Sequence, residues 1–216
     1  MSRKYLGYIL FFVIVVIGFF IASFWGTDRL EARSPSISYV RPFSFTTENG
    51  EKFTDRDMAG KVCLVNFFFT TCKGICPKMN HHVNEIYTEF KDYPEFLIVS
   101  HTSDPERDDV AQLKRYADSL KVNEHKWIFL TGRKDSLYNQ ARLSYLLDDP
   151  QNSLKNIDDE FLHTQFIALV DKNGDIRGSI YDGLKEKDLD KLKKDIKTLL
   201  QEKPGKSRFS IDMATN

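Results

Sequence analysis

Residues 61–79 read KVCLVNFFFTTCKGICPKM and contain the most informative pattern of the sequence. Residues 61–69 form an almost unbroken apolar run, rich in β-forming residues and short enough for a strand that is buried on both faces. A segment with helical spacing follows from Pro77 to about Lys91, and proline is well tolerated in the first turn of a helix. A buried strand that leads directly into a helix predicts the centre of an α/β sheet.

The same alternation continues toward the C-terminus. Further strands are predicted at residues 96–99 and 127–130, and helices at residues 105–120 and 135–144. Residues 165–170 and 176–180 flank an Asn173-Gly174 turn, and a lysine-rich amphipathic helix is predicted at residues 187–200. Parallel βαβ units followed by a β-hairpin and a last helix are the order of a thioredoxin-like α/β sandwich.

Toward the N-terminus, two short β-prone runs at residues 43–46 and 52–54 flank Asn49-Gly50. An Asn-Gly pair between such runs indicates a hairpin, because both positions tolerate a positive φ. Residues 27–38 carry mixed charge, serine and proline without periodicity, which is typical of a tether. We therefore expect an N-terminal β-hairpin on the thioredoxin-like domain, preceded by a linker.

Residues 5–25 contain no charged residue, and as a helix they are about 31 Å long, which is one hydrocarbon thickness. A cleaved signal peptide has a shorter apolar region and a small-residue cleavage site, which residues 24–26 do not offer. We therefore expect one transmembrane helix, retained as an anchor. Arg3 and Lys4 before this run favour a cytoplasmic N-terminus, so the soluble domain is expected outside the cytoplasm, in a periplasm or its equivalent.

These features predict four parts: an anchor at residues 1–26, a linker at 27–38, a thioredoxin-like domain at 39–203 and a tail at 204–216. The 17 phenylalanines support a packed core. Lys plus Arg and Asp plus Glu both number 31, so the net charge of zero gives no electrostatic reason to expect a nucleic-acid partner.

A cysteine pair, Cys72 and Cys76, lies between the central strand and the following helix. Functional groups gather at the carboxyl ends of strands in such sheets, and a helix N-terminus favours the thiolate, so we expect lowered thiol pKa values here. Three residues separate the two cysteines, whereas the thioredoxin redox motif has two, and the longer spacing favours a metal clip over a dedicated redox switch. In an oxidising compartment the pair forms a disulfide unless a metal or a reductant prevents it.

Two thiolates seldom complete a metal site, so a histidine is expected to join them. His163 stands at the head of the predicted strand at residues 165–170, at a sheet edge near the cysteine loop in a thioredoxin-like topology, and is our choice. The isolated Cys63 is predicted to be a buried core residue. The remaining histidines are predicted at the surface: His81 and His82 on a solvated helix face, His101 at a strand end and His125 in a loop.

Two sulfurs and one imidazole form a soft donor set with few ligands. Such a set suits copper better than calcium or magnesium and leaves zinc one ligand short. Copper is therefore the predicted ion, with zinc plus a water molecule as the open alternative.

The sequence resembles the Sco/SenC family of copper chaperones. The matching pieces are GKVCLVNFFFTTCKGICPKM (60–79), SDPERDDVAQLKRYA (103–117), WIFLTG (127–132) and HTQFIALVDKNGDIRGSIYDG (163–183). The resemblance implies a thioredoxin-like fold, an N-terminal anchor and copper ligands at Cys72, Cys76 and His163. Many members place an acidic residue before the histidine, whereas Leu162 stands here, so a carboxylate acting on that imidazole is not expected.

The resemblance also implies a task, which is to assemble the binuclear copper centre of a cytochrome c oxidase by delivering copper or by reducing that centre's cysteines. The implied partners are the copper-bearing oxidase subunit and a thioredoxin-like reductant. On this hypothesis the chain is a binding protein without catalytic residues.

The alternative is a membrane-anchored thiol-disulfide oxidoreductase in which Cys72 and Cys76 act without metal. A third hypothesis, peroxide reduction, needs one strongly activated cysteine instead of a pair.

Overall fold

The computed structural model describes residues 3–25, 34–72, 74–148 and 165–209, and the chain divides into two units, Met1–Ser34 and Pro35–Asn216. In the first unit, helix α1 extends over Arg3–Trp25. Within the part of the chain that the structure describes, no helix combines the length and the apolar character needed to cross a membrane. The predicted membrane span therefore stays a prediction.

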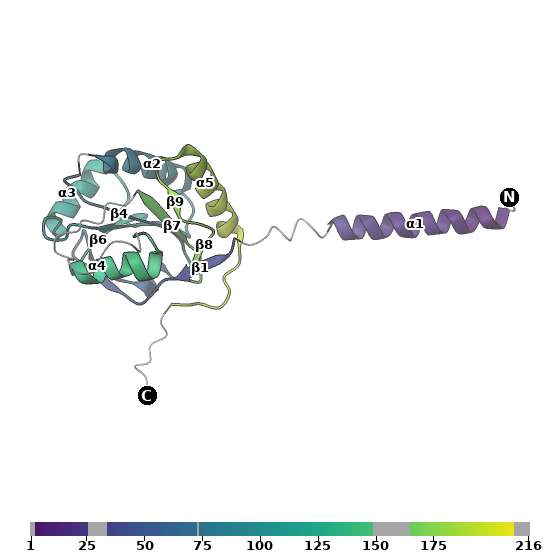
Figure 1. Ribbon diagram of the computed structural model, residues 1–216, viewed down its shortest axis with the longest axis horizontal. Coiled ribbons are helices and arrows are strands. Elements are labelled where there is room, and N and C mark those ends of the chain that lie inside the picture. Colours follow the sequence, from purple (N-terminus) through teal and green to yellow (C-terminus); the bar gives the residue numbers. More distant parts are fainter. Residues whose placement is uncertain (1–2, 26–33, 73, 149–164, 210–216) are drawn as a thin grey trace, which may run out of the picture. The chain divides into compact units, whose positions relative to one another are not determined.

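The second unit is built on one nine-stranded sheet with helices on both faces (Figure 1). The strand order is β1-β8-β7-β4-β5-β6-β2-β3, and the short β9 pairs with β7. The strands are β1 (Ser36–Tyr39), β2 (Ser44–Thr47), β3 (Lys52–Thr54), β4 (Val62–Phe68), β5 (Phe96–Thr102), β6 (Trp127–Thr131), β7 (Phe166–Val170), β8 (Asp175–Arg177) and β9 (Tyr181–Asp182).

The centre of the sheet has the predicted βαβ architecture. Strands β4, β5 and β6 are parallel, and their connections contain helices α2 (Ile75–Phe90) and α3 (Val110–Leu120). Strand β7 pairs antiparallel with β4 on the other side. Helix α4 (Lys134–Gln140) continues into a π-helical turn, Ala141–Tyr145, and α5 (Glu186–Gln201) is the last helix. This mixed α/β arrangement confirms the predicted thioredoxin-like fold.

Each face of the sheet carries its own apolar core. All side chains of β4 are buried, because Val62, Leu64 and Phe68 face the core under α2, α3 and α5, while Cys63 and Val65 face the opposite core. Figure 1 shows α2, α3 and α5 together on one face and α4 on the other. Burial on both faces explains why this strand is apolar without alternation, and the buried Cys63 confirms its predicted role as a core residue.

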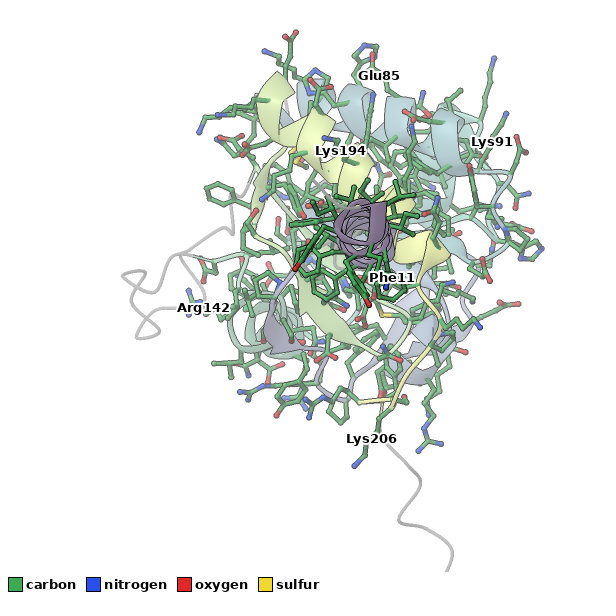
Figure 2. The ribbon with its side chains drawn as sticks, turned by 90° about the vertical axis from the view of Figure 1, so that its right-hand side faces the viewer. Phe11, Glu85, Lys91, Arg142, Lys194 and Lys206 are labelled. Carbon is green, nitrogen blue, oxygen red and sulfur yellow. The ribbon has the colours of Figure 1, made fainter. Side chains whose placement is uncertain are left out.

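Charged side chains cover the outer surfaces of the helices. Figure 2 shows Glu85 and Lys91 pointing outward from α2 and its end, and Lys194 pointing outward from α5. The apolar stripe of α5 faces the sheet through Leu192 and Ile196, which are fully buried. This division is the pattern of an amphipathic helix on a sheet.

The predicted N-terminal hairpin is present. Strands β2 and β3 pair antiparallel, and Gly50 in the turn has a φ of 79°, a value that non-glycine residues seldom adopt. Thr46 and Thr47 of β2 also pair with β6, so the hairpin extends the sheet at that edge.

Two predicted helices differ from those in the structure. Helix α3 begins at Val110 instead of residue 105, because the Asp109 side chain accepts a hydrogen bond from the Gln112 amide and caps the helix there. The helix predicted at residues 135–144 loses its α geometry after Gln140 and closes with Leu146 in the left-handed conformation.

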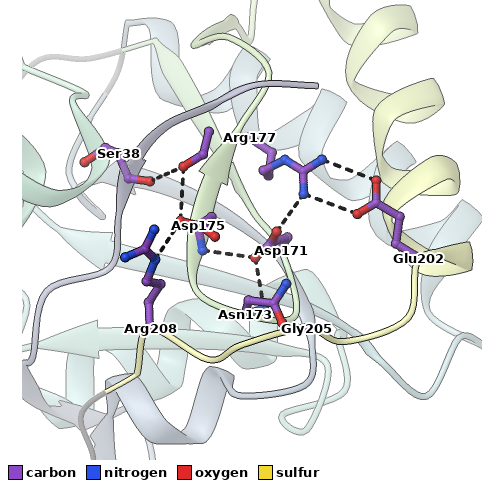
Figure 3. A network of polar contacts seen from close by, with 9 residues as sticks. Ser38, Asp171, Asn173, Asp175, Arg177, Glu202, Gly205 and Arg208 are labelled. Atoms are coloured by element: carbon purple, nitrogen blue, oxygen red, sulfur yellow. Dashed lines mark hydrogen bonds and ion pairs between the residues drawn. The ribbon is translucent and has the colours of Figure 1, made fainter. Parts of the chain in front are cut away.

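Two stretches outside the predicted domain take part in its structure. Strand β1 begins at Ser36, inside the predicted linker, and pairs with β8. In the predicted tail, Gly205 donates from its amide to the Asn173 side chain at 2.6 Å, and Phe209 is buried against Gly174. Figure 3 shows the polar contacts of this C-terminal strap, which we define as residues 202–209.

The C-terminal strap is fixed to the β7–β8 turn by ion pairs. Arg177 of β8 bonds Asp171 at 2.7 Å and Glu202 at 3.2 Å, and Arg208 lies 3.5 Å from Asp175 (Figure 3). The Arg177 and Asp171 side chains are almost fully buried, so each charge depends on the other.

Candidate metal centre

The cysteine pair lies at the carboxyl end of β4, as predicted. Strand β4 ends at Phe68, and the Cys72 amide donates to the Phe69 carbonyl at 3.2 Å, which closes a tight turn. Cys76 is the second residue of α2. Cys72 is half-buried and Cys76 is buried, and neither is in a disulfide.

The two thiols contact each other. Burial raises the pKa of Cys76 to about 12, and a hydrogen bond with Cys72 adds to the rise. The expectation of a lowered pKa is therefore wrong for Cys76, because desolvation of the thiolate at this buried position outweighs the favourable helix N-terminus. Without a metal, Cys76 is a protonated thiol at neutral pH.

A surface cavity of about 410 Å³ opens beside the pair, between the cysteine loop, α2 and α3. Its lining mixes apolar and polar groups: Phe69, Thr70, Cys72, Cys76, Pro77, Asn80, His81, Asn84, Tyr116 and Leu120. Both cysteines are therefore open to an incoming ion or thiol from this side.

The wall of the cavity on α3 is Tyr116. Its ring stacks on Phe68 with centroids 5.2 Å apart, and its hydroxyl accepts a hydrogen bond from the Asn80 side chain. Burial raises the pKa of Tyr116 to about 12, so the phenol stays neutral beside the thiols. Sequence reasoning placed Tyr116 within the helix predicted at residues 105–120 and gave it no role at the site.

A second polar group near the cysteines is the buried carboxylate of Asp108. It accepts hydrogen bonds from the Thr70 hydroxyl at 2.5 Å, from the Thr70 amide at 3.1 Å and from the Thr102 hydroxyl at 2.5 Å. Thr70 lies two residues before Cys72. Sequence reasoning missed Asp108, since it is one of several acidic residues in residues 104–109 and only the fold shows which of them contacts the cysteine loop.

His163 lies outside the described residues, so the third predicted ligand has no geometry here. The described chain resumes at Gln165, whose carbonyl accepts from the Gly183 amide at 2.8 Å. Strand β7 starts next, and Ile167 pairs with Asn66 of β4. The first residues of β7 therefore lie at the carboxyl end of β4, the same edge as the cysteine loop.

The predictions for the other histidines are only partly correct. His81 is exposed and lies 3.7 Å from Glu85, and His125 is exposed in the loop before β6. His82, predicted to be solvated, is half-buried, and its Nδ1 lies 2.8 Å from the Gly183 carbonyl. His82 thus joins α2 to the segment that holds Gln165.

The prediction of a surface position for His101 is wrong. The ring is fully buried in β5 and stacks on Phe67 with centroids 4.9 Å apart. Burial lowers the pKa of His101 to about 3, and neither ring nitrogen has a hydrogen-bond partner among the described residues. The strand continues to Thr102, beyond its predicted end, and carries His101 into the core.

Within the residues that the structure describes, no three His, Cys, Asp or Glu side chains form a group suited to hold a metal ion. The cysteine pair supplies two soft donors, and a metal bound there needs further ligands from outside this set.

The arrangement defines a class: a thioredoxin-like domain with a CxxxC pair at the junction of the central strand and the following helix. The family model described as SCO1/SenC matches residues 31–201. The chain therefore belongs to the SCO1/SenC family.

Known relatives and solved structures agree with this membership. The SCO1 protein homolog of Bacillus subtilis is 27% identical over 172 residues, which cover 78% of this chain and 86% of that protein. BsSco is described as a member of the Sco family of cytochrome c oxidase assembly proteins, with a disulfide switch. Its structure matches with a TM-score of 0.66 and 28% sequence identity, and the match covers 79% of this chain and 98% of that one. Bradyrhizobium japonicum ScoI, solved with copper bound, is 26% identical with a TM-score of 0.58, and the match covers 75% of this chain and 99% of that one.

Proposed function

We propose that this protein is a copper-binding metallochaperone that helps to assemble the binuclear copper centre of a cytochrome c oxidase. The observation that carries the proposal is the contact between the Cys72 and Cys76 thiols at the edge of a surface cavity. Two adjacent soft donors with access from solvent can accept a soft ion and release it again. Copper is the cargo of this site.

His163 is the proposed third ligand, and the contacts around Gln165 support it. A methyl group on Gly183 would lie 2.9 Å from the Gln165 carbonyl and 3.1 Å from Met79 of α2. Met79 is one helical turn beyond Cys76, a rise of about 5 Å. Two residues of extended chain span at most about 7 Å, so residue 163 stays near Gln165. The start of β7 and the cysteine loop share one edge of the sheet, which supports this choice of ligand.

Copper binding at this pair is coupled to proton release. Because the pKa of Cys76 is raised to about 12, the ion must displace a proton from that thiol to form a thiolate bond. Copper affinity is therefore expected to increase with pH in the neutral range, and acid favours release of the ion.

The recipient is the copper-bearing subunit of the oxidase, and a thioredoxin-like reductant returns the cysteines to the thiol form, as membership of a family containing oxidase assembly proteins supports.

The charge-free residues 5–25 support a single-pass anchor with the domain outside the cytoplasm. Retention of the full chain in carbonate-washed membranes tests the anchor, and release into the soluble fraction would contradict it.

Anaerobic copper titration of the reduced full chain in detergent micelles tests the function. We expect one copper ion per chain and a thiolate-to-copper absorption band, both lost in Cys72→Ser and Cys76→Ser. No uptake by the wild-type chain above the level of these variants would refute the proposal.

A second candidate function is thiol-disulfide exchange without metal. The free, mutually contacting thiols favour it, and BsSco is described as having a disulfide switch. This alternative predicts reduction of an insulin-type substrate that persists in His163→Ala and in the presence of a copper chelator. The metallochaperone predicts that His163→Ala weakens copper binding and leaves disulfide formation intact.

A further inference from the structure

We propose that Asp108 is a positioning residue for the cysteine pair, acting through Thr70 on the turn that presents Cys72. The inference rests on the proposed role of that pair. We call Asp108, Thr70 and Thr102 the Asp108 network.

The Asp108 network joins three segments that are distant in sequence. Thr70 belongs to the cysteine loop, Thr102 is the last residue of β5, and Asp108 precedes α3. The Asp108 side chain is fully buried. One carboxylate therefore holds the loop after β4 against the end of the neighbouring strand.

Both oxygens of the Asp108 carboxylate accept hydrogen bonds within the Asp108 network. Oδ1 accepts from the Thr70 hydroxyl at 2.5 Å, while Oδ2 accepts from the Thr70 amide at 3.1 Å and the Thr102 hydroxyl at 2.5 Å. Hydrogen bonds to a carboxylate are short and strong, and a buried one is costly to lose. The Thr70 amide and hydroxyl are thus held by one group, which fixes the direction in which the chain leaves β4.

A further contact links the same point to α3. The Gln112 side chain donates to the Thr70 hydroxyl at 3.1 Å, and the Gln112 amide is capped by Asp109 at 2.7 Å. Thr70 and Tyr116 of α3 both line the cavity beside the cysteines. The Asp108 network therefore fixes the loop to the helix that forms the opposite wall.

The expected effect of this constraint is on the relation between the two sulfurs. The Cys72 amide donates a hydrogen bond to the carbonyl of Phe69, next to Thr70, at 3.2 Å, and this ties Cys72 to the loop. Cys76 is fixed by α2. If the loop is released, Cys72 samples more positions, and closing the Cys72–Cys76 bond loses its geometric advantage. The equilibrium then shifts toward the dithiol.

The test measures the Cys72–Cys76 dithiol-disulfide equilibrium of the full chain against glutathione of set ratio. Glutathione supplies or accepts the two electrons, and the copper site is not involved. We expect Asp108→Asn and Thr70→Val to favour the dithiol at least tenfold, about 30 mV for a two-electron couple. The double variant should show no larger shift than either single one, since both changes break the same link.

Two matched variants control for charge and for the side chain. Asp109→Asn removes the same charge one residue away at an exposed position, and asparagine still caps α3, so the equilibrium should stay within about twofold of wild type. Thr70→Ser keeps the hydroxyl and should also stay near wild type.

A wild-type equilibrium in both Asp108→Asn and Thr70→Val, with only lower resistance to urea, would overturn the proposal and leave Asp108 a structural role. If Asp108→Asn does not fold, Thr70→Val decides alone. If the wild-type chain binds no copper while the two variants still shift the equilibrium, the metallochaperone is refuted and the positioning role of Asp108 stands.

Discussion

At the scale of the residue, burial decides the chemistry of the three cysteines. Cys63 lies in the centre of β4 with no exposed surface, and burial raises its thiol pKa to about 12. Cys76 has a similarly raised pKa but borders the cavity and contacts Cys72. Access to the cavity and contact with a second thiol, and not acidity, distinguish Cys76 from the core cysteine Cys63.

The first prediction follows from this difference. Cys63→Ala should keep the copper stoichiometry of the wild type, because the thiol faces the core on the other side of the sheet. Its cost should appear only in urea unfolding, at roughly 1 kcal/mol for the small cavity. A loss of copper binding in Cys63→Ala, measured by the same anaerobic titration, would show that the ligands are wrongly assigned.

A second prediction concerns His101 and acid stability. The pKa of His101 is about 3 in the folded protein, while an unfolded histidine titrates near pH 6.5. Below about pH 6.5 the unfolded chain therefore gains a proton that the folded protein excludes, and stability falls as the pH falls toward 3. Between pH 6.5 and pH 4 the contribution of His101 to this loss is on the order of 3 kcal/mol.

The variant His101→Phe fits among the surrounding aromatic rings and has no proton to gain. We expect its free energy of unfolding, measured in urea between pH 7 and pH 4, to fall less steeply than that of the wild type. His125→Gln, a change at an exposed position, should retain the wild-type slope. Equal slopes in His101→Phe and wild type would contradict the assignment.

At the scale of the element, the main strands and helices followed from apolar spacing, and the misses have local causes. The apolar run that includes residues 62–68 predicted β4, and the helical spacing after Pro77 predicted α2. Strand β1 was missed because Ser36–Tyr39 is four residues long and three of its side chains are exposed, so it shows little apolar pattern. Its pairing with β8 is a tertiary contact that no local signal contains.

For the candidate site, the sequence predicted the cysteine pair and its strand-to-helix position but not its surroundings. The Cys72–Cys76 spacing is a local pattern, which is readable without the fold. The roles of Asp108 and His82 depend on contacts with Thr70 and Gly183 across long stretches of chain. The raised pKa of Cys76 depends on packing, which the helix-dipole argument did not include.

A third prediction concerns the segment that precedes β7. A methyl group on Gly183 would lie 2.9 Å from the Gln165 carbonyl, so Gly183→Ala must change the spacing between residue 183 and the start of β7. We expect copper to dissociate about tenfold faster from this variant, because the proposed ligand His163 is two residues before Gln165. A methyl group on Gly205 would have its nearest neighbour, the Asn173 side chain, at 3.7 Å, which is an ordinary contact. The control variant Gly205→Ala should therefore release copper at the wild-type rate. Stopped-flow transfer to a chelator measures both, and equal rates would contradict the prediction.

The C-terminal strap gives a fourth prediction. Phe209 is 5% exposed and packs on Gly174, so Phe209→Ala should lower the free energy of unfolding by roughly 2–4 kcal/mol. Phe166 is 41% exposed, and Phe166→Ala should cost less than about 1 kcal/mol. Urea unfolding compares the two variants, and equal costs would show that the strap does not contribute to the core.

At the scale of the whole molecule, the unit Pro35–Asn216 combines a nine-stranded sheet with a cysteine pair at one edge. Two buried cores fix β4 from both faces, and β7 pairs with β4 so that its first residues lie at the edge of the cysteine pair. Ligands from two distant parts of the sequence can thus meet without either core being opened. This property is what a protein needs if it is to gain and lose an ion repeatedly.

We propose that the imidazole of His163 joins the two sulfurs on one copper ion. Pulsed electron paramagnetic resonance of the Cu(II)-loaded full chain tests it most directly, since a bound imidazole gives a characteristic nitrogen modulation. We expect this modulation in the wild type and in His81→Ala, and its loss in His163→Ala. An unchanged nitrogen signal in His163→Ala would contradict the claim.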